Sequence, residues 1–150
     1  MFEELDKFSN KVASQIIEKF PQWEQHAGVD EYKGEKAFLV KIPSPSSESD
    51  NSLRIDTYRD EVTVTFDAYH AHFDEFEDPD DADALSLVNQ IISDEMIVVS
   101  YWRDEQWCGS LPVDKNELPS TNEEYPYANL IKIRSWSGRY NNEITCTPKN

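Results

Sequence analysis

The chain has few of the residues that form disulfide frameworks, zinc sites and phosphate-binding loops. Its 150 residues include two cysteines, Cys108 and Cys146, and four glycines. Two cysteines this far apart form neither a disulfide framework nor a CxxC zinc motif. The sequence also has no P-loop, GxGxxG or GxSxG motif. We therefore expect no cofactor and no nucleophilic active site, and Cys108, which lies beside aromatic residues, is not expected to be a reactive thiol.

The sequence is also short of basic residues and of long apolar runs. Lys and Arg number 14 against 30 Asp and Glu, so the formal net charge is −16. This balance disfavours binding to nucleic acid or to an anionic membrane, because phosphate groups attract Lys and Arg and repel carboxylates. The start, MFEELDKFSNKV, lacks the pattern of a signal peptide, and no apolar run reaches the roughly 20 residues that cross a bilayer. The sequence therefore predicts a soluble protein of a reducing cytoplasm.

The hydrophobic content indicates that the chain folds. Hydrophobic residues make up 38% of the sequence and aromatic residues 12%, which is too much for a disordered acidic chain. A length of 150 residues is close to the usual size of one domain and is enough to bury a core without disulfides or metals. We therefore expect residues 1–150 to form a single domain and a monomer.

The spacing of apolar residues predicts two helices. Apolar side chains recur at intervals of three and four between Phe2 and Phe20, and Pro21 follows as a stop. A second amphipathic pattern covers about residues 82–93. Its first turn is expected to be rich in Asp, which suits the positive end of the helix dipole. Each helix is expected to pack one face on a sheet.

Alternating and β-branched residues predict the strands. The strand-like segments are residues 36–42, 52–58, 61–73, 96–102, 107–113, 129–136 and 143–147. Arg59-Asp60 is expected to be a tight hairpin turn, and a proline- and serine-rich loop follows residue 42. Short connections favour antiparallel pairing. The predicted fold class is α+β, a mainly antiparallel sheet of about five to seven strands with an N-terminal helix and a second helix packed on it.

Two histidines form the first candidate site. His70 and His72 would project from the same face of an extended strand, which is one way to begin a metal site. If the alternation that starts at Val62 continues, they share a face with the apolar side chains and Asp67 points to the other face. His26 is the third and last histidine. We favour partly buried, hydrogen-bonded strand histidines at the end of a core strand, and a metal-dependent enzyme is the alternative.

The acidic run, residues 74–83 (DEFEDPDDAD), is the second candidate site. Seven of its ten residues are carboxylates, and residues 61–124 carry −15 of the net charge, against −4 for residues 1–60 and +3 for residues 125–150. The run could be a solvated loop before the helix. A calcium loop is disfavoured because the run has no glycine and no D-x-[DN]-x-[DN]-G pattern. A docking surface for a basic protein is the third interpretation, because such a density of carboxylates can occupy a groove built for phosphates.

Aromatic residues are more numerous than a small core needs, and Tyr and Trp are favoured at protein interfaces because they bury a large area with little loss of rotamer entropy. Trp136 lies where a predicted strand runs into a turn. We therefore expect a partner-binding surface rather than a catalytic or metal site. The candidate partner-binding residues are Tyr69, His70, His72, Asp74, Glu75, Glu77, Asp78, Asp80, Asp81 and Trp136.

Three segments, EVTVTFDAYHAHF (61–73), IVVSYW (97–102) and IRSWSG (133–138), resemble those of immunity proteins from bacterial polymorphic and contact-dependent toxin systems. Those proteins are small, acidic, cytosolic α+β inhibitors that neutralise a cognate toxin domain. The resemblance implies an inhibitor without catalytic activity, and the acidic character indicates a basic toxin domain, such as a nuclease, as its partner. A metal-dependent enzyme built on His70 and His72 and a scaffold or adaptor protein remain alternatives.

Overall fold

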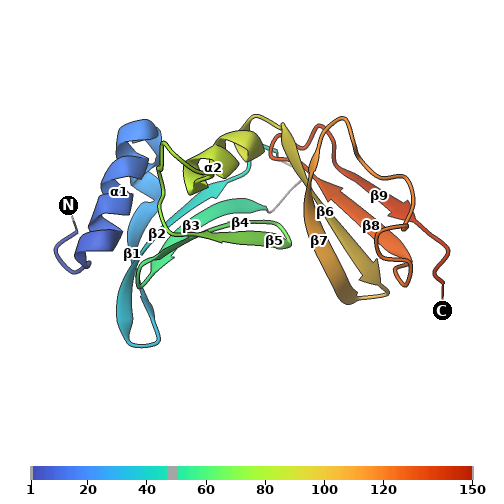
Figure 1. Cartoon of the computed structure of the whole chain (residues 1–150), viewed down its shortest axis with the longest axis horizontal. Helices are drawn as coiled ribbons and strands as arrows, with labels where there is room; N and C mark the ends of the chain where they lie inside the picture. Colours follow the sequence, from blue (N-terminus) through green and yellow to red (C-terminus); the bar gives the residue numbers. More distant parts are fainter. Residues whose placement is uncertain (1, 47–50, 150) are drawn as a thin grey trace. The chain divides into compact units, whose positions relative to one another are not determined.

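A computed structural model describes residues 2–46 and 51–149. It confirms the α+β class, with antiparallel strand pairing and an N-terminal helix. Within the described residues the strands form two sheets, of order β1-β2-β3-β4-β5 and β7-β6-β8-β9 (Figure 1). The sequence pattern predicted one sheet of about five to seven strands, because alternation shows which strands have a buried face but not which strands share a core.

The chain divides into two compact units, and the single-domain organisation stays a prediction. The first unit is residues 1–43, 52–65 and 70–88, and the second is residues 44–51, 66–69 and 89–150. The first sheet and its helices comprise α1 (Lys7–Lys19), the 3-10 helix η1 (Pro21–His26), β1 (Ala27–Tyr32), β2 (Glu35–Pro43), β3 (Ser52–Tyr58), β4 (Glu61–Phe66), β5 (Tyr69–Phe73) and α2 (Ala84–Ile92). The second sheet comprises β6 (Met96–Arg103), β7 (Gln106–Asp114), β8 (Leu130–Arg134) and β9 (Asn142–Thr145).

Helix α1 starts later than its apolar pattern because a capping residue fixes its first turn. The side chain of Asp6 accepts a hydrogen bond from the Ser9 amide at 2.7 Å, which satisfies one of the free N–H groups at the helix start. Val12 and Ile16 are buried on one face. The helix ends at Lys19, ahead of Pro21 as predicted.

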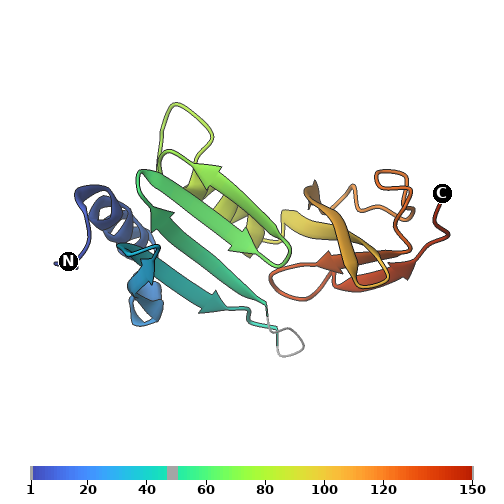
Figure 2. The same cartoon turned by 90° about the horizontal axis from the view of Figure 1, so that it is seen from below.

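The core of the first unit lies between its helices and one face of the five-stranded sheet. Along β3 the buried residues Leu53, Ile55 and Thr57 alternate with more exposed ones. The hydroxyl groups of Ser9 and Thr57 are 2.7 Å apart, so α1 packs on this face. Figure 2 shows the sheet from the side that the helices leave uncovered. We call that side the open face.

Residues 61–73 form a hairpin rather than the single long strand expected from the sequence. Strand β4 ends at Phe66, a turn follows at Asp67 and Ala68, and β5 begins at Tyr69. Asp67 has a φ of 53°, in the left-handed region that Asp tolerates better than most residues. The turn resets the alternation, so the prediction that His70 and His72 share a face with the apolar residues of β4 is wrong. Both histidines are exposed, so the expectation that they are partly buried is also wrong.

Helix α2 confirms the second predicted helix, with a different first turn. It spans Ala84–Ile92, and its first turn contains no acidic residue. The expectation of an Asp-rich first turn is wrong because the aspartates precede the helix and lie in the loop that leads to it.

The second sheet follows the predicted strands closely. Strands β6 and β7 pair antiparallel through a tight turn at Asp104 and Glu105, as the sequence indicated. The buried cluster on one side of this sheet is Ile97, Val99, Tyr101, Ala128, Ile131 and Ile133. Among residues 2–46 and 51–149, no helix is long and apolar enough to cross a membrane. The proline- and serine-rich loop lies in part outside the described residues.

Candidate functional site

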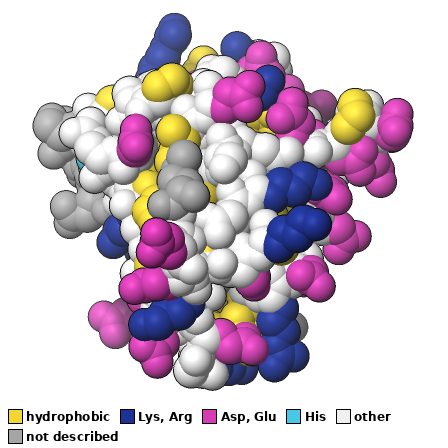
Figure 3. Space-filling model, turned by 90° about the vertical axis from the view of Figure 1, so that its left-hand side faces the viewer, with side chains coloured by type: hydrophobic (Ala, Val, Ile, Leu, Met, Phe, Trp, Pro, Cys, Tyr) yellow, Lys and Arg dark blue, Asp and Glu magenta, His cyan; other side chains and the backbone are white. Residues whose placement is uncertain are grey.

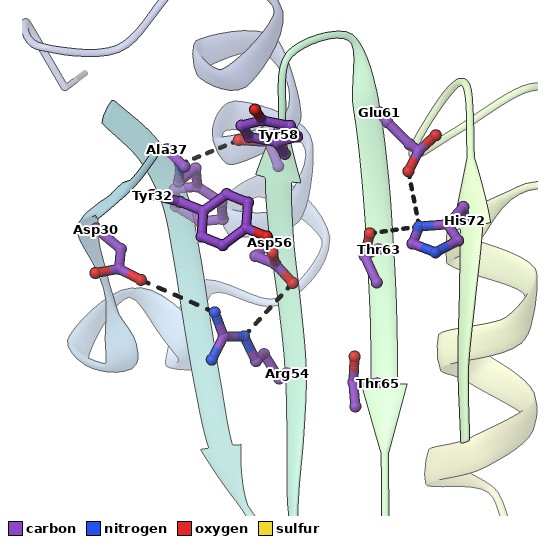
Figure 4. A pocket seen from close by; sticks show the side chains of 12 residues that line it. Asp30, Tyr32, Ala37, Arg54, Asp56, Tyr58, Glu61, Thr63, Thr65 and His72 are labelled. Atoms are coloured by element: carbon purple, nitrogen blue, oxygen red, sulfur yellow. Dashed lines mark hydrogen bonds and ion pairs between the residues drawn. The ribbon is translucent and has the colours of Figure 1, made fainter. Parts of the chain in front are cut away.

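The open face of the first sheet carries a groove with a volume of about 420 Å³. Its lining residues come from β1 to β5 and are Asp30, Tyr32, Ala37, Phe38, Arg54, Asp56, Thr57, Tyr58, Glu61, Thr63, Thr65 and His72 (Figure 4). Most of these side chains are polar or aromatic. All twelve residues belong to the first unit, so its own fold positions them.

Arg54 links two carboxylates at the β1 side of the groove. Its Nη2 lies 3.9 Å from Oδ2 of Asp30, and its Nε lies 3.5 Å from Oδ1 of Asp56. Burial raises the pKa of Asp56, although the neighbouring Arg54 acts in the opposite direction. The negative charge of Asp56 is therefore only partly compensated by its arginine.

Two tyrosines stand beside these charges. The rings of Tyr32 and Tyr58 meet edge to face with centroids 4.9 Å apart, and half of the surface of Tyr32 is exposed. Two cations of the chain approach the same rings. Lys33 Nζ lies 5.3 Å from the centroid of Tyr32, and the guanidinium carbon of Arg59 lies 5.2 Å from that of Tyr58. The pair has the geometry of a surface that attracts positive charge.

His72 lies at the β5 side of the groove, where it contacts two residues of β4. Its Nδ1 is 2.7 Å from Oε1 of Glu61 and 2.8 Å from the hydroxyl of Thr63. The rings of His70 and His72 meet edge to face with centroids 5.1 Å apart. In the part of the chain that the structure describes, no group of three or more His, Cys, Asp or Glu residues could hold a metal ion. The two histidines therefore lack a third ligand there.

The acidic run passes from the end of β5 toward α1. Phe76 is fully buried and anchors the run in the core. Lys11 Nζ lies 3.1 Å from Oε2 of Glu75, and Lys19 Nζ lies 3.4 Å from Oε1 of Glu77. Both lysines belong to α1, which packs on the buried face of the sheet. The structure therefore separates these two glutamates from the histidines, which lie on the open face.

The remaining carboxylates of the run differ in their surroundings. Asp83 is buried, and its side chain accepts hydrogen bonds from the amides of Asp78 and Ser86. Asp78 accepts from the amide of Asp80 at 2.9 Å, and Asp81 accepts from the amide of the next residue at 2.8 Å. These bonds within the run stabilise its turns, so several carboxylates have a local structural role as well as a surface position.

The two aromatic candidates of the predicted surface, Tyr69 and Trp136, belong to the second unit. Trp136 is half-buried, and its ring packs against that of Phe66 with centroids 5.9 Å apart. Ser44 donates a hydrogen bond to the backbone carbonyl of Trp136 at 2.7 Å. The ten predicted surface residues therefore come from both units, and most of them come from the first.

The first unit has a large excess of negative charge. It contains 18 carboxylate side chains and 8 Lys and Arg side chains, which gives a formal charge of −10. On the face shown in Figure 3, carboxylates and basic side chains lie next to one another rather than as a surface of one sign. The excess includes the carboxylates of the groove, Asp30, Asp56 and Glu61.

Sequence reasoning missed the β1 and β3 side of the groove. Arg54, Asp56 and Tyr58 alternate with the buried residues of β3. This alternation in the sequence could have shown that the three residues share a face. Asp30 and Tyr32 lie in β1, which has no apolar alternation and was not predicted as a strand. The pairing of β1 with β2 places both residues on the open face.

The fold and the groove define an α+β protein with an uncovered, polar and aromatic sheet face. The chain matches no protein-family model, no curated protein and no solved structure.

Proposed function

We propose that the chain is a binding protein without catalytic activity that neutralises a basic toxin domain, with a nuclease as the expected class. The observation that carries this proposal is the open face of the first sheet, which presents carboxylates and tyrosines on a solvent-exposed groove. Tyrosines are enriched at protein interfaces, and the rim around such residues is polar. The resemblance of three segments to bacterial immunity proteins supports the same class.

Electrostatics favour a basic partner. The formal charge of −10 on the first unit attracts positively charged proteins and increases their rate of association at low salt. Nucleases bind polyanions through basic grooves, and a protein that carries closely spaced carboxylates can occupy such a groove. Inhibition then follows from exclusion of the nucleic acid.

The partner surface combines the histidines of β5 with the more accessible part of the acidic run. Asp74, Asp80 and Asp81 are exposed, whereas Glu75 and Glu77 are paired with lysines of α1. We therefore assign the long-range attraction to Asp74, Asp78, Asp80 and Asp81. The contacts that set the affinity are assigned to side chains near His70 and His72, which lose their bound water when the partner binds.

The test uses the product of the gene adjacent to the one that encodes this chain. Calorimetry at low and moderate salt measures binding, and an activity assay of that product measures neutralisation. We expect tight binding, loss of toxin activity, and weaker association as salt rises because screening reduces charge attraction. No binding, or binding that leaves the toxin fully active, would contradict the proposal.

A charge-matched pair of variants tests the acidic run. The first carries Asp74→Asn, Asp78→Asn, Asp80→Asn and Asp81→Asn, in which the amide oxygens still accept the backbone hydrogen bonds. The control carries Glu95→Gln, Glu105→Gln, Glu117→Gln and Glu123→Gln, all exposed residues of the second unit. We expect the first variant to bind about tenfold more weakly at low salt, since exposed charges contribute a few tenths of a kcal/mol each. If the two sets of substitutions weaken binding equally, the acidic run is not part of the partner-binding surface.

A further inference from the structure

The groove of the open face keeps a net negative charge after its internal ion pairs are counted. Its charged lining residues are Asp30, Asp56, Glu61, Arg54 and His72. Three carboxylates face one arginine, so the groove has a formal charge of −2 with neutral His72 and −1 with protonated His72. The charges of the lining residues therefore complement a cation in either state, and Lys33 and Arg59, which lie near the tyrosine rings but outside the lining, are the competing cations of the chain.

The carboxylates of the groove can accept more hydrogen bonds than Arg54 donates to them. The contacts of Arg54 with Asp30 and Asp56, at 3.9 and 3.5 Å, are ion pairs that are longer than the roughly 2.7–2.9 Å of a charge-assisted hydrogen bond. The raised pKa of Asp56, caused first by burial, agrees with incomplete compensation of its charge. A second guanidinium near Asp56 would compensate the rest of the negative charge of this carboxylate.

The aromatic wall favours a planar cation. Tyr32 and Tyr58 form an edge-to-face pair that already has a lysine and an arginine of the chain near its rings. A guanidinium can stack on such a ring while it pairs with a carboxylate, and an ammonium group cannot match this geometry. A volume of about 420 Å³ is within the range of sites that hold small ligands and large side chains.

We propose that this groove receives an arginine side chain of the protein partner, which pairs with Asp56 and stacks on the tyrosine pair Tyr32–Tyr58. The inference rests on the proposed function and assigns the anchoring contact to the groove, whereas the acidic run supplies attraction at a distance. It also gives the β1 and β3 side of the open face a role that the sequence analysis did not assign.

The experiment records amide ¹H–¹⁵N spectra of the full chain during titration with the peptide acetyl-Gly-Arg-Gly-amide. Peptides with lysine and with uncharged citrulline in place of arginine are the matched probes. We expect saturable shifts in the millimolar range at open-face residues of β1, β3 and β4, smaller shifts with lysine, and none with citrulline. Equal shifts with citrulline, or arginine shifts confined to residues 74–83, would overturn the proposal.

Variants identify which carboxylate binds. Asp56→Asn should weaken the arginine peptide at least fivefold, and Glu61→Gln, which changes an exposed residue, should weaken it about twofold. Glu105→Gln, which changes an exposed residue of the second unit, is the control and should bind as the unchanged chain does. The amide spectrum itself reports whether each variant is folded, and if Asp56→Asn is unfolded, the Glu61→Gln result decides. Unchanged affinity in a folded Asp56→Asn variant overturns the proposal.

This experiment and the toxin assay fail independently. If the adjacent gene product binds and is neutralised but the arginine peptide does not select the groove, the arginine site is wrong and the inhibitor function stands. If arginine binds the groove but that gene product neither binds nor is neutralised, the proposed function is wrong and the site remains a receptor for guanidinium groups.

Discussion

Ser86 donates two hydrogen bonds to the same oxygen of Asp83, from its amide at 2.8 Å and from its hydroxyl at 2.7 Å. The other carboxylate oxygen of Asp83 accepts from the amide of Asp78 at 2.7 Å. One buried side chain thus joins the start of α2 to the acidic run that precedes it. Burial alone would raise the pKa of Asp83, but the hydrogen bonds from Ser86 and Asp78 outweigh it, so the pKa is lowered.

The Asp83→Asn variant should therefore lose stability, and the loss should depend on pH. Its amide oxygen can still accept the hydrogen bonds from Ser86, but its NH2 group cannot accept the one from the amide of Asp78. A lost hydrogen bond to a charged group costs about 1.5–3 kcal/mol. Because the pKa of Asp83 is lowered in the folded state, its stabilising contribution is complete above the ordinary value of 3.8 and is lost as pH falls through the folded-state pKa. Urea denaturation at pH 6 and at pH 2.5 measures the difference between the two proteins.

The Asp81→Asn variant is the control for this measurement, since Asp81 is exposed and its local hydrogen bond to the next amide can be kept by Asn. A stability gap between the unchanged protein and Asp83→Asn that is as large at pH 2.5 as at pH 6 would show that the charge of Asp83 has no part in the cap.

The acidic run should detach from the core when its buried anchor is removed. Phe76 is fully buried, and Phe→Ala substitutions at such positions cost about 3–5 kcal/mol because they remove apolar contacts and leave a cavity. We expect Phe76→Ala to lower the free energy of unfolding by that amount. Hydrogen exchange should also increase at the amides of Asp78 and Ser86, which depend on the position of the run. Unchanged protection of both amides would contradict the anchoring role.

The sequence predicted elements well where one face of a strand or helix is buried. Alternating apolar residues located β4 and β8, a continuous apolar run located β6, and the apolar stripe located α1. The same method failed at Asp67, because Asp67 is the one turn-favouring residue of its two-residue turn and the β-prone pattern continues on both sides of it. That turn determines which face carries His70 and His72, so one missed turn changed the predicted surroundings of the site.

The parts of the site that were not predicted depend on contacts between distant residues. Lys11 and Glu75 are 64 positions apart, and nothing near either residue indicates that they pair. Strand β1 lacks alternation because its last residues, including Asp30 and Tyr32, are exposed at the edge of the sheet. Only its antiparallel pairing with β2 in the structure shows that this segment is a strand of the sheet. Charge counting located an acidic segment but could not show that α1 neutralises part of it.

Asp56 should respond to pH in the opposite direction to Asp83. Burial raises its pKa in the folded state against the opposing influence of Arg54, so the folded protein holds this proton more tightly than the unfolded chain. The ionised form therefore costs stability above the folded-state pKa, and the cost is relieved as pH falls toward 3.8. We expect Asp56→Asn to be within about 1 kcal/mol of the unchanged protein at pH 7, and to become relatively less stable as pH falls.

Denaturation of both proteins between pH 3.5 and 7 measures this trend. Asp30→Asn is the control, because Asp30 is the other partner of Arg54 and is exposed. The opposite outcome is that Asp56→Asn is several kcal/mol less stable than the unchanged protein at pH 7 and that this difference shrinks at pH 3.5. In that case the ion pair with Arg54 outweighs burial, and the negative charge of Asp56 is fully compensated.

Gly109 in β7 is buried, and its missing side chain makes room for the ring of Tyr125. A Cβ atom at this position would overlap the end of that ring, which packs against Tyr101 with centroids 4.8 Å apart. We therefore expect Gly109→Ala to displace Tyr125 and to lower the free energy of unfolding by about 1–3 kcal/mol, the usual cost of overpacking.

A double-mutant cycle identifies the cause of that loss. In a Tyr125→Ala background the clash is absent, so Gly109→Ala should cost much less there than in the unchanged protein, and the difference is the coupling energy of the two positions. Gly28→Ala is the matched control because a Cβ added at Gly28 would meet no atom within 4 Å, and it should change stability by less than about 0.5 kcal/mol. If Gly109→Ala costs the same in both backgrounds, the loss comes from the backbone of β7 rather than from Tyr125.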